Sequence, residues 1–274
     1  MVKKANRPLV SLWSGTGEYS ELLVTYGMAK AFLGEFEGAY SSISRARDLA
    51  LAGDERFGLL YVDILGGWAS SLRGDWRDGL QRFRDAIKRG EEVHDVTFFH
   101  LAWGGTGWCH YLQGDLKTAR ECAEKAIRNQ EASGIPIMAS VLRLLKGMIG
   151  LDLGDLAAAR SATEEALRLS LANNEKHFEG WARIWLGRIT GKSGVPKLAE
   201  AEESILQGMK ILHELEIKPF EASGYLFLGE LYADAGQEER AISQLRKAKA
   251  MFQEMDMDYW LAKTEKVLEK LKER

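Results

Sequence analysis

A cassette of about 40 residues recurs six times along this 274-residue chain. Each copy has a glycine, a turn seven residues later, and then two small residues spaced seven apart. The first glycines are Gly27, Gly67, Gly107, Gly147, Gly187 and Gly229, separated by 40, 40, 40, 40 and 42 residues. Self-similarity at such a period is typical of stacked repeats, in which each unit buries its apolar face against its neighbours.

The third copy indicates what each cassette folds into. Gly114 accepts a left-handed backbone and Asp115 can cap the helix that follows, so this dipeptide predicts a turn between two helices. Gly107 then lies inside the first helix, and Ala119 and Ala126 lie on the second. A glycine inside a helix costs about 1 kcal/mol relative to alanine, so six at one phase indicate close approach of two helix backbones. Each unit is therefore predicted to be an antiparallel helix pair.

The sequence predicts an all-α, right-handed α-solenoid of six helix pairs plus a C-terminal capping helix. The expected pairs span 18–53, 54–93, 94–134, 135–174, 175–217 and 218–257, followed by the capping helix at 258–274. Residues 1–17 precede the repeats and are interpreted as a candidate remnant of an earlier one. Gly53, Gly134 and Asn174 stand where second helices should end, and all three tolerate a left-handed turn.

The two ends of the array differ. The last helix carries an apolar stripe that includes Trp260 and an outer charged face, which suits the end of a stack. The N-terminus has no equivalent, so Leu22, Val24 and Tyr26 are expected to contribute to an apolar surface. Further chain, residues 1–14 or a second copy would have to cover it, which makes a homo-oligomer through the N-terminal face one expectation.

These fixed positions resemble the tetratricopeptide repeats, a family with a small residue inside the first helix and two alanines on the second. The family's large residue four positions before the glycine is present as Leu23, Trp103 and Tyr225, and is replaced by Asp63, Arg143 and Arg183. A period of 40 in place of about 34 implies longer helices. Long-helix arrays with a similar C-terminal tail look like the sensor regions of bacterial signalling ATPases and ATPase-coupled nucleotide cyclases.

Composition and charge argue against nucleic acid and against a membrane as partners. With 37 basic and 40 acidic residues the formal charge is −3, which does not favour nucleic-acid binding. Residues 96–114 are uncharged, but their histidines, threonines and glycines suit a buried helix better than a membrane span. Cys109 and Cys122 fit a reducing compartment and are interpreted as small core residues, with a disulfide or a metal pair with His110 as the alternative. We therefore expect a cytoplasmic protein.

Catalytic patterns are weak. The stretch Gly191-Lys192-Ser193 resembles a phosphate-binding loop, but Leu186 stands where that loop requires a glycine, and an exposed turn is the simpler interpretation. The five histidines show no metal-ligand spacing. We expect no enzymatic activity, no cofactor and no metal site.

The resemblance implies that one stripe of the first helices faces a concave groove. The candidate groove residues are Met28, Tyr61, Ile64, Trp68, Leu101, Trp108, Tyr111, Leu144, Met148, Arg188 and Glu230. If first helices lie about 10 Å apart, the apolar part spans about 30 Å, which suits an extended segment of about nine residues. Methionine and tryptophan are common both in adaptable binding surfaces and in cores, so the same stripe is equally compatible with a core.

Two functions follow as expectations. The first is a non-enzymatic interaction module that binds a peptide or a partner helix in the groove. The alternative is a ligand-sensing regulatory array of a larger bacterial signalling or transcription-regulating ATPase or nucleotide cyclase. Arg183, Arg188 and Lys192 on the fifth first helix could meet an anionic group, with a solvated charged face as the alternative.

Overall fold

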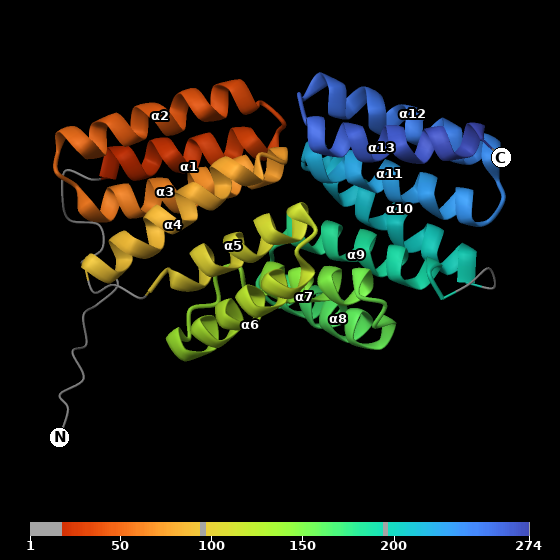
Figure 1. Ribbon diagram of the computed structural model, residues 1–274, viewed down its shortest axis with the longest axis horizontal. Coiled ribbons are helices and arrows are strands. Elements are labelled where there is room, and N and C mark those ends of the chain that lie inside the picture. Colours follow the sequence, from red (N-terminus) through yellow and green to blue (C-terminus); the bar gives the residue numbers. More distant parts are fainter. Residues whose placement is uncertain (1–17, 94–96, 194–196, 274) are drawn as a thin grey trace.

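The computed structural model describes residues 18–93, 97–193 and 197–273, and these fold into thirteen α-helices (Figure 1). The first helices of the pairs are α1 (Glu18–Phe32), α3 (Arg56–Arg73), α5 (Phe99–Gln113), α7 (Ala139–Asp152), α9 (Lys176–Gly191) and α11 (Lys218–Asp234). The second helices are α2 (Phe36–Ala52), α4 (Trp76–Glu92), α6 (Leu116–Ser133), α8 (Leu156–Ala172), α10 (Leu198–Glu214) and α12 (Glu238–Glu254), and α13 (Asp258–Lys272) closes the array. This confirms the predicted all-α solenoid.

The candidate remnant at residues 1–17 lies outside the described residues. Among the helices described, none combines the length and the apolar character needed to cross a bilayer.

The turns inside the pairs form as the sequence predicts. Gly114 has a φ of +87°, and the Asp115 side chain accepts a hydrogen bond of 3.1 Å from the backbone N–H of Thr118. Asp155 caps α8 in the same way. Left-handed glycines occupy the equivalent turns at Gly34, Gly74, Gly154 and Gly236.

The turns between pairs follow the prediction at two of three places. Gly134 and Asn174 have φ values of +68° and +55°. Gly53 was expected to be left-handed but has a φ of −88°, and Asp54 takes the left-handed conformation instead, with a φ of +52°. The Gly53 N–H still donates to the carbonyl of Leu49 in the helical pattern, so the helix ends one residue later than the glycine suggests. Aspartate is among the residues that adopt this conformation most readily.

The glycines inside the first helices lie against the second helices, as expected. A Cβ atom on Gly107 would lie 3.1 Å from the carbonyl oxygen of Ala119. At Gly187 the corresponding distance to the carbonyl oxygen of Ala201 is 2.5 Å. Real Cβ atoms essentially never show the distance found at Gly187, and the one at Gly107 is tighter than most, so a larger residue at either place would push the two helices apart.

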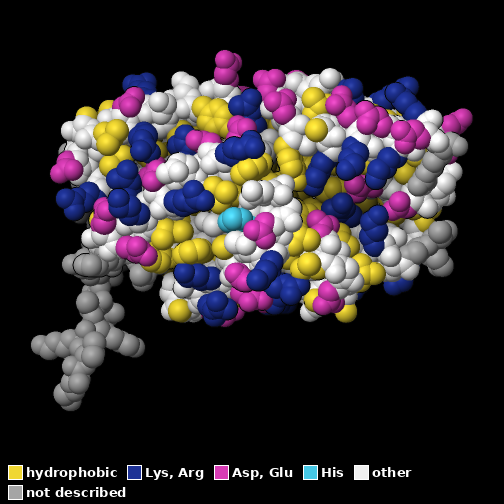
Figure 2. All heavy atoms as spheres, in the orientation of Figure 1, with side chains coloured by type: hydrophobic (Ala, Val, Ile, Leu, Met, Phe, Trp, Pro, Cys, Tyr) yellow, Lys and Arg dark blue, Asp and Glu magenta, His cyan; other side chains and the backbone are white. Residues whose placement is uncertain are grey.

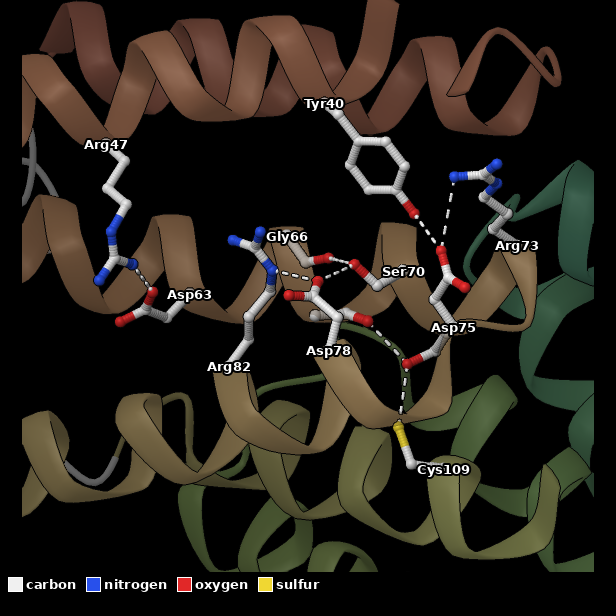
Figure 3. Close-up of polar contacts among 12 residues, drawn as sticks. Tyr40, Arg47, Asp63, Gly66, Ser70, Arg73, Asp75, Asp78, Arg82 and Cys109 are labelled. Atoms are coloured by element: carbon white, nitrogen blue, oxygen red, sulfur yellow. Dashed lines mark hydrogen bonds and ion pairs between the residues drawn. The ribbon is translucent and has the colours of Figure 1, made fainter. Parts of the chain in front are cut away.

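Charged residues replace the family's large residue at three places, and there they join helices. Asp63 on α3 is fully buried and pairs with Arg47 of α2 (Figure 3). It also pairs with Arg89 of α4 at 2.9 Å. Burial raises the pKa of Asp63, and the two guanidinium groups oppose that rise. Arg143 bonds to Gln130 and to Glu131 of α6, at 2.7 and 2.8 Å.

Both cysteines are free and buried. The thiol of Cys109 lies 3.1 Å from the hydroxyl oxygen of Ser71, which joins α5 to α3 (Figure 3). Burial raises the pKa of Cys109 to about 12, so this thiol stays protonated and unreactive at neutral pH. Burial also raises the pKa of Cys122. This environment is that of a small core residue.

Replacing Gly187 by alanine tests the close approach of the helices. Alanine is the better helix former, but its methyl group would have to displace the backbone of α10. We expect Gly187→Ala to lower the free energy of unfolding in urea by about 1–3 kcal/mol. Gly38 is the matched control, because its Cβ would meet the end of the flexible Lys30 side chain. Gly38→Ala should be neutral or stabilising, and equal losses in both variants would contradict the interpretation.

Candidate functional site

The array bends back on itself, so that its first two pairs meet its last pair and α13 (Figure 1). We call this contact the seam. Its residues are Phe32, Gly34, Arg73 and Gly74 on the N-terminal side, and His177, Phe220, Met255, Asp256 and Tyr259 on the C-terminal side. Arg73 Nε donates a hydrogen bond of 3.0 Å to the carbonyl oxygen of Asp256, which is 183 residues further along the chain. The seam therefore turns an open solenoid into a closed one.

Two turn glycines make the seam possible. A Cβ on Gly74 would lie 2.7 Å from Tyr259 Cβ, and one on Gly34 would collide with the Met255 side chain. At Gly114, Gly154 and Gly236 a Cβ would have no neighbour within 4 Å. These five turns share a left-handed backbone, but only those at Gly34 and Gly74 touch the other end of the array.

A chain of aromatic rings crosses the interior behind the seam. Phe32 of α1 packs against Phe220 of α11 with ring centroids 5.9 Å apart. Phe220 stacks on Trp181 of α9 at 4.0 Å, and Trp181 contacts Trp108 of α5 at 4.9 Å. Trp108 in turn lies 6.1 Å from Trp68 of α3. Helices from both ends and from the middle of the chain thus contribute to one aromatic cluster.

These rings enclose a small apolar cavity. Its volume is about 30 Å³, and Met28, Leu72 and Met138 complete its lining together with the aromatic side chains. That volume holds a water molecule or two. Binding sites for small molecules measure about 300–1,000 Å³. In this conformation the cavity among the rings is too small for a ligand of that size.

Most of the predicted groove residues lie inside this closed array. Seven are buried: Ile64, Trp68, Leu101, Trp108, Tyr111, Leu144 and Met148. Met28 and Tyr61 are half-buried and pack against the core. Trp68 Nε1 donates a hydrogen bond of 3.2 Å to the carbonyl oxygen of Leu101, which ties two members of the stripe together. The core alternative describes these side chains in the closed conformation.

The charged end of the stripe is internally neutralised. Arg188 pairs with Glu230 at 3.1 Å, and its guanidinium lies 4.2 Å from the centre of the Phe227 ring. Arg183 and Lys192, the other two candidates for an anionic group, pair with Glu179 at 3.1 Å and with Asp234 at 2.6 Å. Each of the three cations therefore already has an acidic partner, which weakens the interpretation of an anion site.

Titratable groups border the seam. Burial raises the pKa of Tyr259 to about 12, and the nearby carboxylate of Asp152 adds to the rise. Burial lowers the pKa of Lys263, and the charge of Arg188 lowers it further. Burial also lowers the pKa of His177, whose ring lies 5.3 Å from that of Phe32. Of the seam's own side chains, His177 is the one whose ordinary pKa lies nearest neutrality, and burial moves that pKa towards acid.

Sequence reasoning missed three central residues of this site. Trp181 stands six residues before Gly187, the stripe position that Tyr61 and Leu101 occupy in earlier pairs, although the candidate set omits it. Phe32 and Phe220 lie outside the stripe, and no local pattern distinguishes them, because the seam brings them together.

Comparisons with known proteins agree with this architecture. Residues 73–134 and 222–253 match sequence profiles of the tetratricopeptide repeat. Both stretches are therefore tetratricopeptide repeats, as their glycine and alanine positions predicted. No curated protein sequence matches the chain.

Solved structures with a similar fold have low sequence identity. The Rap conjugation gene regulator of plasmid pLS20, in complex with the Phr* peptide, is 15% identical with a TM-score of 0.72 over 90% of this chain and 66% of its own. NprR in complex with its cognate peptide NprX is 14% identical, with a TM-score of 0.67 over 95% and 73%. A signal transduction ATPase with a tetratricopeptide repeat sensor from Pyrococcus horikoshii is 16% identical, with a TM-score of 0.52 over 95% of this chain and 39% of its own. The chain thus spans about two fifths of that ATPase and about two thirds of the Rap regulator.

Replacing Gly74 by alanine tests the seam. Both Gly74→Ala and Gly114→Ala place a side chain at positive φ, which costs about 1–3 kcal/mol. Only Gly74→Ala also pushes Tyr259 away. We expect it to increase the radius of gyration measured by small-angle X-ray scattering, while Gly114→Ala leaves that radius unchanged. Equal radii in the two variants would show that the seam does not depend on this contact.

The pKa of His177 predicts a pH dependence. The unfolded state binds a proton near pH 6.5, whereas burial lowers the pKa in the folded state. Stability from this group is therefore present above about pH 6.5 and is lost as the pH falls below it. We expect the urea midpoint to fall between pH 7.5 and 5.5, and His177→Phe to reduce that fall. His100, whose pKa burial also lowers, should account for part of the remainder. An unchanged pH profile in His177→Phe would contradict the assignment.

Proposed function

We propose that this chain is a cytoplasmic interaction module, without catalytic chemistry of its own, that binds a short peptide or a partner helix along its concave face. The observation that carries the proposal is the aromatic cluster behind the seam. Trp68, Trp108, Trp181 and Phe220 come from four different helices and contact one another ring to ring. Tryptophan-rich apolar surfaces of this kind supply most of the binding energy where proteins recognise peptides.

Similar structures support a peptide as the ligand. The Rap regulator and NprR are both described as complexes with peptides, and both have this fold. Their ligands belong to those proteins, and the transfer to this chain is our proposal. The apolar part of the stripe would take an extended segment of about nine residues.

Binding requires the seam to open. A cavity of about 30 Å³ has no room for a side chain, so the ligand's apolar groups must replace contacts such as those of Phe32 with Phe220. The observed affinity is then the affinity of the open form reduced by the fraction of molecules that are open. Weakening the seam should therefore strengthen binding, up to the point at which the array no longer folds.

The regulatory-array alternative draws on the same contact. Because the seam joins the first two pairs to the last pair, a ligand that opens it moves the two ends of the array apart. The signal transduction ATPase from Pyrococcus horikoshii carries such repeats as a sensor. A plain interaction module needs only affinity for its partner. A sensor must also change its end-to-end distance on binding, which scattering can measure.

A peptide titration tests the proposal. The probe is a library of nine-residue peptides, each with two or three leucine or phenylalanine residues, and the signal is the intrinsic tryptophan fluorescence, to which the clustered Trp108 and Trp181 contribute. We expect binders from this library, and we expect Gly74→Ala to bind them up to about tenfold more tightly than the wild type. The control is Gly114→Ala, which has the same backbone strain without the collision.

Two results would contradict the proposal. One is the absence of any binder for the wild type and Gly74→Ala alike. The other is binding that leaves the fluorescence of the buried tryptophans unchanged, since the ligand would then lie elsewhere on the surface.

A further inference from the structure

The outer face of α1 is apolar and exposed. Tyr19, Leu22 and Tyr26 follow one another at spacings of three and four, so they lie on one side of the helix. They are 52%, 65% and 54% exposed. Val24, which the sequence placed on the same surface, is fully buried and faces the core instead.

The later repeats show what this face is built to contact. The position of Leu22 corresponds to Val62 in α3, Ala102 in α5, Leu142 in α7 and Ala182 in α9. All four are at most 1% exposed, because each of these helices packs against the pair that precedes it. In α1 the same face carries large apolar side chains, and no helix of the described residues packs against it.

We propose that this face binds the same face of a second copy of the chain, with the two α1 helices antiparallel around a twofold axis. Antiparallel packing is the arrangement that second helices already make on first helices in this array. The three exposed side chains of α1 form a nearly symmetrical row, in which Leu22 stands between Tyr19 and Tyr26. A twofold contact therefore sets Tyr19 against the other copy's Tyr26 and places Leu22 close to the axis.

The opposite end of the array argues against head-to-tail stacking. The outer face of α13 exposes Lys266, Glu269 and Lys270. Placing α1 of another copy there would bury these charges against tyrosine and leucine without partners, which is unfavourable. A contact between two α1 faces sets apolar side chains against each other and closes at two copies, with Lys30, whose ammonium lies 5.1 Å from the centre of the Tyr26 ring, at its edge.

The contact between the two α1 helices is small. A helix of 15 residues is about 22 Å long, so one helix face buries less than the roughly 800 Å² per partner of a standard interface. The dimer should accordingly be weak and depend on concentration, and the chain should be mainly monomeric when dilute.

Sedimentation and light scattering of the full chain provide the test. Between about 1 and about 500 µM we expect the mass to rise from 30.7 kDa towards twice that value. Leu22→Arg should reduce the association constant at least about tenfold, because it places two like charges at the axis. Leu171→Arg is the matched control, since Leu171 is 49% exposed on α8, and it should leave association unchanged. Thermal melting of each variant checks that the fold is intact.

Crosslinking gives a second measurement. Cys109 and Cys122 are buried, so Leu22→Cys would carry the accessible thiol. A short bis-maleimide should link two copies of this variant and leave the wild type unlinked. A full chain that stays monomeric at every concentration would overturn the proposal, whatever else covers the face. A dimer that Leu22→Arg does not weaken would overturn it equally.

Discussion

The close approach of two helix backbones within each pair is the contact on which the array depends. In five of the six pairs, the Cβ that the first-helix glycine lacks would lie 3.4 Å or less from a backbone oxygen of the second helix. That oxygen always belongs to the small residue early in the second helix, such as Ala119 facing Gly107. Because the same contact recurs, each pair crosses at a similar angle and the pairs stack with a similar rotation. In the second pair the ring of Phe83 fills the place of that contact against Gly67.

Repeated rotation alone does not explain why the array closes. The concave side carries large apolar side chains, including Trp68 and Trp108, and an open groove would expose them to water. Full burial of one such side chain is worth about 1.5–3 kcal/mol. Closing at the seam recovers that energy without any partner. A ligand must therefore compete with the protein's own aromatic contacts, such as the stacking of Trp181 on Phe220.

Local patterns in the sequence predicted what depends on neighbours along the chain. The helix pairs, the left-handed glycine at Gly114 and the cap at Asp115 each follow from a few adjacent residues. The seam could not be predicted in this way. The bond from Arg73 to Asp256 depends on small rotations summed over three intervening pairs, and no spacing in the sequence encodes that sum. The residues of the candidate stripe lie on the first helices, but their spacing alone could not decide between groove and core.

The seam also bears on the stability of the first repeat. In a stacked array each pair is stabilised by its neighbours, and α1 has such a neighbour on one side only among the described residues. At its C-terminal end, however, Phe32 contacts Phe220 and His177, and Gly34 lies against Met255. These contacts replace part of the missing interface. Opening the seam therefore does more than expose the aromatic cluster, because it removes support from α1 and α2 and makes them the pair most prone to local unfolding. The closed form protects the apolar interior and the end of the stack by one set of contacts.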